Sequence, residues 1–372
     1  MSLYRLDAMG VTIDGRDLVR GVSLEIAPGE CVALAGASGS GKSLTSLTPF
    51  GLSAGTITGS AVLEGQDLAG LDEAGLRRVR RASVGFVFQQ PLTALTPHRT
   101  AAQHLTESAM QAGGARPDRN TLVAMLDAVG LADPAIKLRR YPHQLSGGER
   151  QRLMIACAIA HKPKLLIADE PVSALDAHLR AEIMALLTRL RRETGMGLLL
   201  VSHDLASLEH HADRVLVMQG GQVVEAGAAQ AIARAPQHAY SQALWAATPS
   251  LKAALPDDLH VPGAPLVEAQ DLTVRFAGKG LFTRPVTAVD AVDLTVHQGE
   301  AVALIGGSGS GKSTIGRAIA GLGPVSAGAV LWNGARLPAR RSLEQRRMIQ
   351  PVFQDPVASL DPRWRVSDII AE

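Results

Sequence analysis

The sequence GASGSGKSL, from Gly36 to Leu44, occurs a second time as GGSGSGKST, from Gly306 to Thr314. Both copies match the pattern GxxxxGK[ST], in which glycines allow the backbone to curl until its amide N–H groups point at phosphate oxygens. The alternative for either copy alone is a glycine-rich turn without a ligand. Because each copy stands between a strand-like run and a helix-like run, we expect two phosphate-binding loops, each at a helix N-terminus.

The residue types in these loops predict how they hold ATP and Mg²⁺. Lys42 and Lys312 are expected to reach the β- and γ-phosphates, and the hydroxyls of Ser43 and Ser313 to ligate the magnesium ion. The remaining loop residues expected at the nucleotide are Gly36, Ser38, Gly39, Ser40, Gly41, Leu44, Gly306, Ser308, Gly309, Ser310, Gly311 and Thr314.

The repetition extends beyond the loops. Residues 18–43 align with residues 288–313, and residues 84–100 align with residues 349–366. Two homologous domains explain these matches better than one domain that contains a similar sequence by chance. The copies differ at one position of the helix expected after the loop, where Pro49 in the first copy corresponds to Ile319 in the second, so the first helix should kink or end early.

The predicted domains are residues 1–247 and 265–372, joined by a linker at 248–264 that prolines interrupt. Short aliphatic runs such as ECVALAG, KLLIADE, GLLLVSH and DRVLVMQGG predict buried strands that alternate with helices, and hence an α/β fold with a largely parallel sheet. A helical insert is expected at about residues 91–150. The second copy is shorter, so we expect the chain to be a fragment or an early-terminated form of a longer tandem protein.

Composition narrows the classes of function. Hydrophobic residues make up 46% of the 372 residues, and 37 basic residues nearly balance 35 acidic ones. This balance gives no electrostatic support for nucleic-acid binding. Two cysteines are too few for a disulfide framework and indicate a reducing compartment. No run is long and apolar enough to span a bilayer, so we expect a soluble chain whose membrane role, if it has one, is through a partner.

Two adjacent acids end the run LLIADEP. Asp169 suits a magnesium ligand, and Glu170 suits the group that orients or deprotonates attacking water. The alternative is a strand followed by solvated acids, which the loop upstream makes less favourable.

A second glycine-containing helix start occurs in LSGGERQR. Ser146, Gly147 and Gly148 would form another phosphate-facing helix N-terminus. One phosphate site hardly needs two such loops, so this one would serve a nucleotide held by another domain. The alternative is a serine-capped helix with no ligand.

The order GASGSGKS, VFQQP, LSGGERQR, LLIADEP, SALD and LLLVSHD resembles the nucleotide-binding domain of ABC transporters over residues 1–247, and the second copy resembles it as far as its glutamine loop. The resemblance implies a P-loop NTPase fold with a RecA-like parallel-sheet core and a helical subdomain, repeated with the second copy truncated. It also implies Gln89 and Gln354 as glutamine-loop residues near magnesium, residues 173–176 as the D-loop, and His203 as a switch histidine near the γ-phosphate.

The strings YPHQLSGGERQRLMIACAIAHKPKLLIADEPVSALD and APQHAYSQALWAATPSL resemble ATPases of dipeptide, oligopeptide and nickel importers. This implies ATP hydrolysis at the cytoplasmic membrane face, with permeases, a solute-binding protein and a second nucleotide-binding domain, in cis or in trans, as partners. The alternative is an ABC-type ATPase acting on DNA, ribosomes or an enzyme complex, whose zinc cysteines or long charged linker are not found here. A small-molecule kinase would leave LSGGERQR and His203 unexplained.

One departure from the family pattern concerns adenine. The family usually stacks the base on an aromatic residue before the first loop strand. Phe276 could serve in the second copy, whereas alignment puts Ile13 at the matching place in the first. Four other histidines are expected at the solvated surface, namely His161, His178, His210 and His211.

Overall fold

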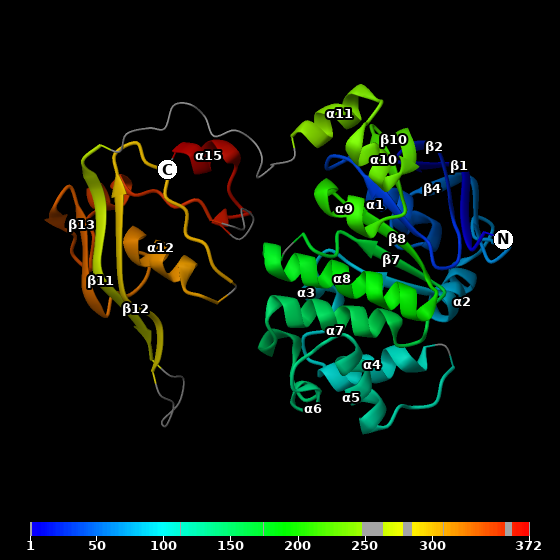
Figure 1. Ribbon diagram of the computed structural model, residues 1–372, viewed down its shortest axis with the longest axis horizontal. Coiled ribbons are helices and arrows are strands. Elements are labelled where there is room, and N and C mark those ends of the chain that lie inside the picture. Colours follow the sequence, from blue (N-terminus) through cyan, green and yellow to red (C-terminus); the bar gives the residue numbers. More distant parts are fainter. Residues whose placement is uncertain are drawn as a thin grey trace. The chain divides into compact units, whose positions relative to one another are not determined.

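The computed structural model describes residues 2–111, 113–173, 175–247, 263–277, 285–307, 309–353 and 359–371. The chain divides into two compact units, Met1–Ala253 and Ala254–Glu372, which are described separately (Figure 1). The predicted linker, 248–264, lies almost wholly outside the described residues.

The first unit is built on a six-stranded sheet in the order β10-β9-β3-β8-β7-β6. All neighbouring strands run parallel except β10, which is antiparallel to β9. The aliphatic runs β3, β7 and β8 are buried along their whole length, as expected for strands covered on both faces. The strands are β3 (Cys31–Ala35), β6 (Val84–Val87), β7 (Leu165–Asp169), β8 (Gly197–Ser202), β9 (Arg214–Gln219) and β10 (Gln222–Ala228). The predicted parallel α/β sheet is confirmed.

A second, antiparallel sheet of the first unit has the order β2-β1-β4-β5. It packs on the six-stranded sheet through one apolar cluster, in which Phe50 lies 5.6 Å from the rings of both Tyr4 and Phe86. The strands are β1 (Tyr4–Ile13), β2 (Arg16–Ile26), β4 (Thr56–Leu63) and β5 (Gln66–Asp67). The end of β1 lies close to Gly55, the residue before β4, and a Cβ at Gly55 would be 3.1 Å from the side chain of Ile13.

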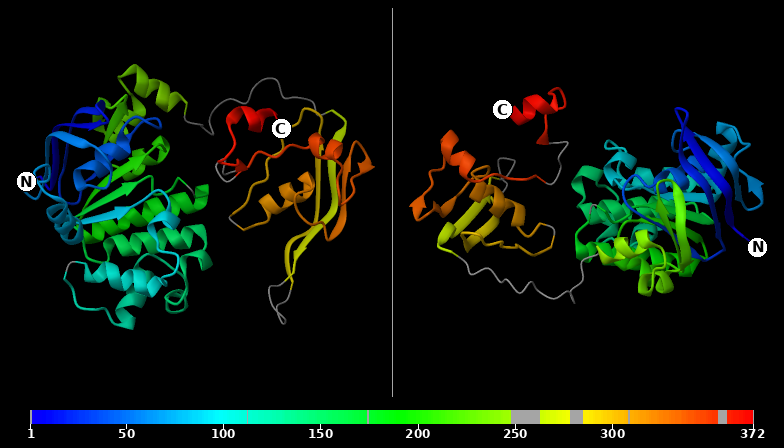
Figure 2. Two further views of the ribbon diagram at one scale, coloured as in Figure 1. Left: turned by 180° about the vertical axis from the view of Figure 1, so that it is seen from behind. Right: turned by 90° about the horizontal axis from the view of Figure 1, so that it is seen from above.

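Helices complete the first unit. Those between β6 and β7 gather at one end of it, where the helical insert was predicted (Figures 1 and 2). They are α3 (Pro91–Ala94), α4 (Ala101–Met110), α5 (Arg119–Ala128), α6 (Pro134–Lys137), η2 (Pro142–Gln144) and α7 (Gly147–Ile159). The others are α1 (Lys42–Leu47), η1 (Thr48–Phe50), α2 (Glu73–Ser83), α8 (Ala177–Thr194), α9 (Leu205–His211), α10 (Ala229–Arg234) and α11 (Ala239–Ala246).

Proline shortens the helix after the first loop. The α-helical part of α1 ends at Leu47, and the chain continues as a 3₁₀ turn through Pro49. The corresponding helix of the second unit, α12 (Lys312–Ala320), continues through Ile319. The difference follows from the missing N–H of proline and the clash of its ring with the preceding turn.

The second unit has the sheet order β12-β11-β13-β14. Its strands are β11 (Pro265–Phe276), β12 (Val286–His297), β13 (Ala327–Trp332) and β14 (Ala335–Arg336), and its helices are α12, α13 (Leu343–Met348) and α15 (Val366–Ala371). Within the described residues of this unit, every strand pair is antiparallel.

The prediction of a strand directly before the second loop is wrong. Residues 299–307 have no strand, and Ile305 is 95% exposed, whereas the equivalent β3 is fully buried. β3 is held by β8 and β9 on its two sides. No parallel neighbour is available within the described part of the second unit, and a central strand without neighbours leaves its amides and apolar side chains unpaired.

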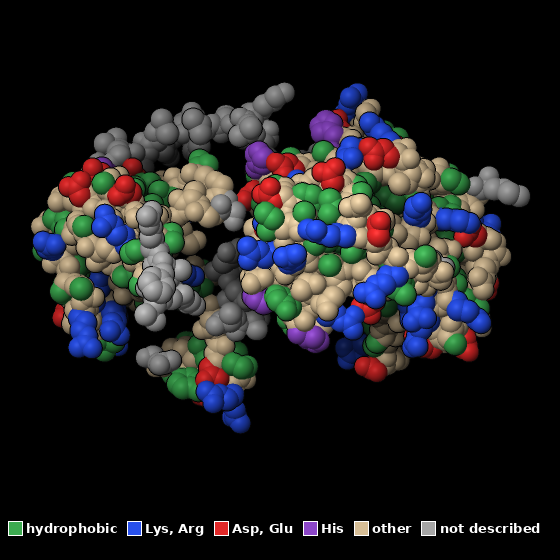
Figure 3. Space-filling view, turned by 90° about the horizontal axis from the view of Figure 1, so that it is seen from below, with side chains coloured by type: hydrophobic (Ala, Val, Ile, Leu, Met, Phe, Trp, Pro, Cys, Tyr) green, Lys and Arg blue, Asp and Glu red, His purple; other side chains and the backbone are tan. Residues whose placement is uncertain are grey.

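Acidic and basic side chains are interspersed on the face shown in Figure 3, in keeping with the nearly balanced charge. No helix in the described ranges combines the length and the apolar character needed to cross a bilayer.

Candidate nucleotide-binding site

The first glycine-rich loop connects β3 to α1. Gly36, Gly39 and Gly41 have φ values of 148°, 78° and 97°, which are accessible to glycine and strained for other residues. A Cβ on Gly36 would lie 2.3 Å from the carbonyl oxygen of Met218 in β9. The loop is therefore curled tightly against the sheet edge, as a phosphate cradle requires.

Lys42 lies folded over this loop. Its ammonium donates to the carbonyl oxygens of Gly36 and Ala37, at 2.9 and 2.8 Å, and the side chain is buried. Burial lowers the pKa of Lys42, and the nearby carboxylates of Glu170 and Asp169 oppose that shift. The cation is held at the concave side of the loop, within reach of a phosphate placed there.

Ser43 and Asp169 are brought together from different elements. The Ser43 hydroxyl, in the first turn of α1, donates to Asp169 Oδ1 at 3.0 Å, at the end of β7. Burial raises the pKa of Asp169, while the Ser43 hydrogen bond lowers it. A hydroxyl and a carboxylate are hard oxygen donors of the kind that Mg²⁺ accepts beside waters and phosphates, so the pair fits the predicted cation.

Glu170 is held by two of the predicted site residues. Gln89 Nε2 donates to Glu170 Oε2 at 3.0 Å, and His203 Nδ1 lies 3.2 Å from the same oxygen. Glu170 follows β7 with φ of 48°, a left-handed conformation uncommon outside glycine. The turn directs its carboxylate toward the residues that follow β6 and β8. The three side chains are assembled at the carboxyl ends of three neighbouring strands.

The LSGG segment forms the N-terminus of α7. Ser146 Oγ accepts the amide of Glu149 at 3.3 Å, and Glu149 accepts the amide of Ser146 at 2.8 Å. This is a capping box, the alternative that the sequence left open. The described hydrogen bonds do not join Ser146, Gly147 or Gly148 to the loop of the same unit. A Cβ at Gly148 would lie 3.1 Å from Leu179 of α8, so glycine permits close helix packing there.

The second loop repeats one feature of the first. Lys312 donates to the carbonyl oxygens of Gly306 and Gly307, at 2.6 and 2.7 Å, although it is more exposed than Lys42. Of the residues predicted for this site, Ser308 and Gln354 lie outside the described part of the chain. Among the described residues, the predicted catalytic side chains are brought together in the first unit.

Ile13 and Phe276 occupy equivalent places in the two units. Each is the last residue of the first strand of an antiparallel pair, β1 or β11, and faces the first residue of the following strand. Phe276 is 45% exposed and available to a planar ligand. The role of these positions in adenine binding stays a prediction.

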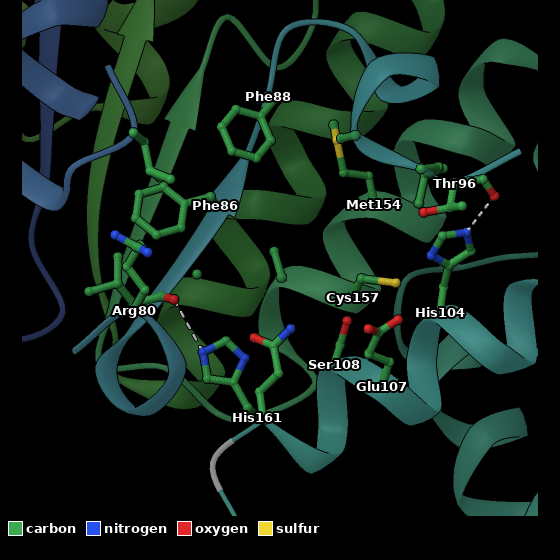
Figure 4. A pocket seen from close by; sticks show the side chains of 17 residues that line it. Arg80, Phe86, Phe88, Thr96, His104, Glu107, Ser108, Met154, Cys157 and His161 are labelled. Carbon is green, nitrogen blue, oxygen red and sulfur yellow. Dashed lines mark hydrogen bonds between the residues drawn. The ribbon is translucent and has the colours of Figure 1, made fainter. Parts of the chain in front are cut away.

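A pocket of about 350 Å³ lies beside β6, the strand that leads to Gln89 (Figure 4). Phe86 and Phe88 of one wall face His104 of α4, Cys157 of α7 and His161, which follows α7. Burial raises the pKa of the Cys157 thiol to about 12, so the thiol is a poor nucleophile.

Two histidines expected at the solvated surface are half-buried. His161 Nε2 is 3.2 Å from the carbonyl oxygen of Val84, and His211 Nδ1 is 3.0 Å from the hydroxyl of Thr188. Burial lowers the pKa of both rings. The expectation failed because charged neighbours in sequence do not show which face of an element packs inward.

One contact with the loop was missed from the sequence. The hydroxyl oxygen of Tyr240, in α11, accepts the amide of Ala37 at 2.9 Å. The string APQHAYSQAL carries no glycine or charge pattern that points to a phosphate loop, so nothing local could reveal it.

The ABC transporter family matches residues 19–173 and 289–369. The glutathione import ATP-binding protein GsiA of Salmonella typhimurium is 40% identical over 96% of this chain and 64% of its own length. The peptidoglycan transport ATP-binding protein YejF of Agrobacterium fabrum is 41% identical over 94% of this chain and 66% of its own length. The chain thus spans slightly less than two thirds of these relatives.

Solved structures give the same fold. A dimeric ATP-binding cassette bound to ADP and Pi, in a post-hydrolysis state, is 30% identical, with a TM-score of 0.55 over 61% of this chain and 98% of that one. CbiO1 of Clostridium perfringens, part of a transporter complex, is 25% identical with a TM-score of 0.54 over 62% of this chain. These likenesses confirm the predicted P-loop α/β cassette fold, while the repeat of that fold in the second unit stays a prediction.

Proposed function

This chain belongs to the ABC transporter family, and we propose that it is an ATP-hydrolysing subunit that energises a membrane importer. The observation that carries the proposal is the geometry around Glu170. A carboxylate suited to activating water is held by Gln89 and His203, next to a loop cation and the Ser43–Asp169 pair. These groups have distinct roles in phosphoryl transfer to water.

The chain's own residues divide the chemistry between them. Backbone amides of the loop and the Lys42 ammonium bind the β- and γ-phosphates and oppose the charge that develops on the γ-phosphate. Glu170 accepts a proton from the attacking water or orients it, and His203 and Gln89 hold the Glu170 carboxylate in place. A magnesium ion bound by Ser43 and Asp169 would supply further positive charge against the phosphates.

A second nucleotide-binding domain would complete the site. The start of α7 offers amide groups and the positive end of a helix, yet Ser146, Gly147 and Gly148 are not bonded to their own loop. We assign them to a nucleotide held by another domain, from the same chain or another chain. Closure over ATP and opening after hydrolysis would then drive the transporter.

Membrane permeases and a solute-binding protein are the proposed partners, reached from the cytoplasmic face of the membrane. The pocket beside β6 is suited to a protruding permease segment because aromatic side chains line it and β6 leads directly to Gln89. Two relatives are named for import of glutathione and transport of peptidoglycan. The proposed cargo class is therefore peptides or related small solutes, with nickel as a further candidate from the resemblance.

The ATPase proposal is tested by binding and hydrolysis measurements on the whole chain. Lys42→Ala should lower kcat/KM for ATP by about 10²-fold or more, since it removes the buried ammonium that would donate hydrogen bonds to the phosphates. Lys164→Ala, at an exposed lysine that pairs with Glu64 on the surface, is the matched control and should match the wild type. Equal activity of wild type and Lys42→Ala would refute the proposed site.

The transport proposal is tested by photocrosslinking in the source cell. A photoreactive amino acid at Gln111, on the rim of the pocket, should capture integral membrane proteins, whereas one at Asp14, on the β1–β2 turn, should not. Capture of ribosomal or nucleic-acid-bound proteins from Gln111 would instead favour the alternative, an ABC-type ATPase that is not coupled to transport.

A further inference from the structure

The helix α11 contacts the phosphate loop through a single tyrosine. The phenol oxygen of Tyr240 accepts a hydrogen bond from the backbone amide of Ala37 at 2.9 Å, across 203 residues of sequence. The Tyr240 ring is half-buried and packs against the larger apolar core of the first unit. The contact therefore joins the loop to a side chain whose position the core restricts.

The N–H that donates to Tyr240 belongs to the same peptide group whose carbonyl oxygen accepts a hydrogen bond from Lys42. The N–H of Ala37 and the C=O of Gly36 lie in one planar unit and point in opposite directions. Lys42 Nζ donates to the Gly36 oxygen at 2.9 Å, while Tyr240 accepts the Ala37 N–H on the other side. One rigid peptide thus connects the tyrosine to the loop cation, and hydrogen bonds in such a chain polarise one another.

Contacts of its own hold the start of α11 in place. Glu225, in β10, accepts the amides of Gln237 and His238 at 2.8 and 3.2 Å. His238 Nδ1 in turn accepts the amide of Tyr240 at 3.2 Å and caps the helix. Tyr240 is therefore anchored to the sheet independently of the loop, so it can orient the loop rather than follow it.

We infer that Tyr240 is a positioning residue of the nucleotide site, which fixes the Gly36–Ala37 peptide so that Lys42 and the loop amides are arranged for a phosphate before it arrives. The inference rests on the proposed ATP binding by the first unit. A loop already ordered loses less conformational freedom on binding. We expect Tyr240 to change the affinity for ATP and not kcat, because its described contacts do not reach Glu170, Gln89 or His203.

The variant Tyr240→Phe removes only the phenol oxygen and leaves the ring to pack as before. Ala37 is an exposed residue, so its amide would bond to water instead and the loss is that of one net hydrogen bond. We expect about a fivefold rise in Kd and KM for ATP, with kcat changed less than twofold, from the ordinary worth of such a bond. The control is Tyr141→Phe, a phenol on the exposed surface that stacks on His143.

The experiment measures ATP binding by calorimetry, steady-state hydrolysis, thermal unfolding and amide hydrogen exchange of Ala37, all on the full chain. Support requires faster exchange at Ala37 and the rise in Kd and KM at unchanged kcat, with Tyr141→Phe equal to wild type. Unchanged Kd and KM, a fall in kcat alone, or a lower melting temperature without an affinity change would overturn the inference. A wild-type chain that binds no ATP would refute the proposed function itself, and the exchange measurement would still report the contact.

Discussion

The hydroxyl of Ser43 donates a hydrogen bond to Asp169, 3.0 Å away, although 126 residues separate the two in sequence. The bond links the first turn of α1 to the end of β7. The Asp169 carboxylate therefore lies buried beside the phosphate loop. Burial raises its pKa, and its hydrogen bond from Ser43 and the charge of Lys42 do not fully offset that effect. Burying this carboxylate costs the empty protein some stability, which the proposed magnesium ion would offset.

Replacing Asp169 with Asn should stabilise the empty chain while removing the proposed magnesium ligand. The folded pKa of Asp169 lies above its ordinary value of 3.8, so the folded state binds this proton more tightly than the unfolded state. The contribution of the Asp169 side chain to the free energy of unfolding is greatest below the ordinary pKa and declines as pH rises through the folded pKa. At pH 7 the variant should melt higher, by about 2–4 °C for each kcal/mol relieved.

The gain should shrink as the pH is lowered toward the ordinary carboxyl range, where the wild-type side chain is neutral as well. Scanning calorimetry of both proteins between pH 5 and pH 8, without nucleotide or divalent cation, measures it. Asp127→Asn, at an exposed acid on α5, serves as the control and should show little change. A variant that melts lower at pH 7 would contradict the assignment.

Replacing Glu170 with Gln should preserve ATP binding and lower turnover by about 10²–10⁴-fold, the usual range for loss of a catalytic base. A glutamine oxygen can still accept from Gln89 and lie beside His203, so the local structure should persist. Filter binding of radiolabelled ATP and a phosphate-release assay separate the two effects. Binding lost together with hydrolysis would show that the carboxylate acts on the nucleotide or on the fold. Glu193→Gln, on the exposed side of α8, is the control.

Changing Ile13 to Tyr should tighten ATP binding at the first site, because a base stacked on an aromatic ring is worth about 1–3 kcal/mol. The motivation is Phe276, which ends β11 as Ile13 ends β1. Titration calorimetry measures the change, and Ile136→Tyr on the exposed part of α6 controls for the added ring. Unchanged affinity would place adenine away from the end of β1.

Hydrolysis by a polypeptide of these 372 residues should rise steeply with its concentration. The LSGG sequence occurs once in the chain, and Ser146 to Gly148 are not bonded to the loop of their own unit. Two chains would have to pair their first units so that each supplies the α7 start to the other. Phosphate release across a wide dilution series measures this. Turnover per chain that stays constant down to nanomolar protein would mean that one chain is sufficient.

Much of the first unit could be predicted from local sequence. The loop from Gly36 to Ser43, the buried strand that ends at Asp169 and the early end of α1 before Pro49 follow from features that contiguous residues carry. Glycine conformations, aliphatic runs and the fixed φ of proline act over a few residues, so one sequence suffices to recognise them.

The tertiary structure alone decided which of these elements meet. The order of the sheet brings Gln89 and His203 to one oxygen of Glu170, and the packing of helices on it half-buries His161 and places Tyr240 of α11 at the amide of Ala37. It also decides that residues 299–307 form no strand, although they repeat the pattern of β3. A strand in the middle of a parallel sheet, such as β3, is hydrogen-bonded to a neighbour on each side, and those neighbours come from distant parts of the chain that no local pattern can supply.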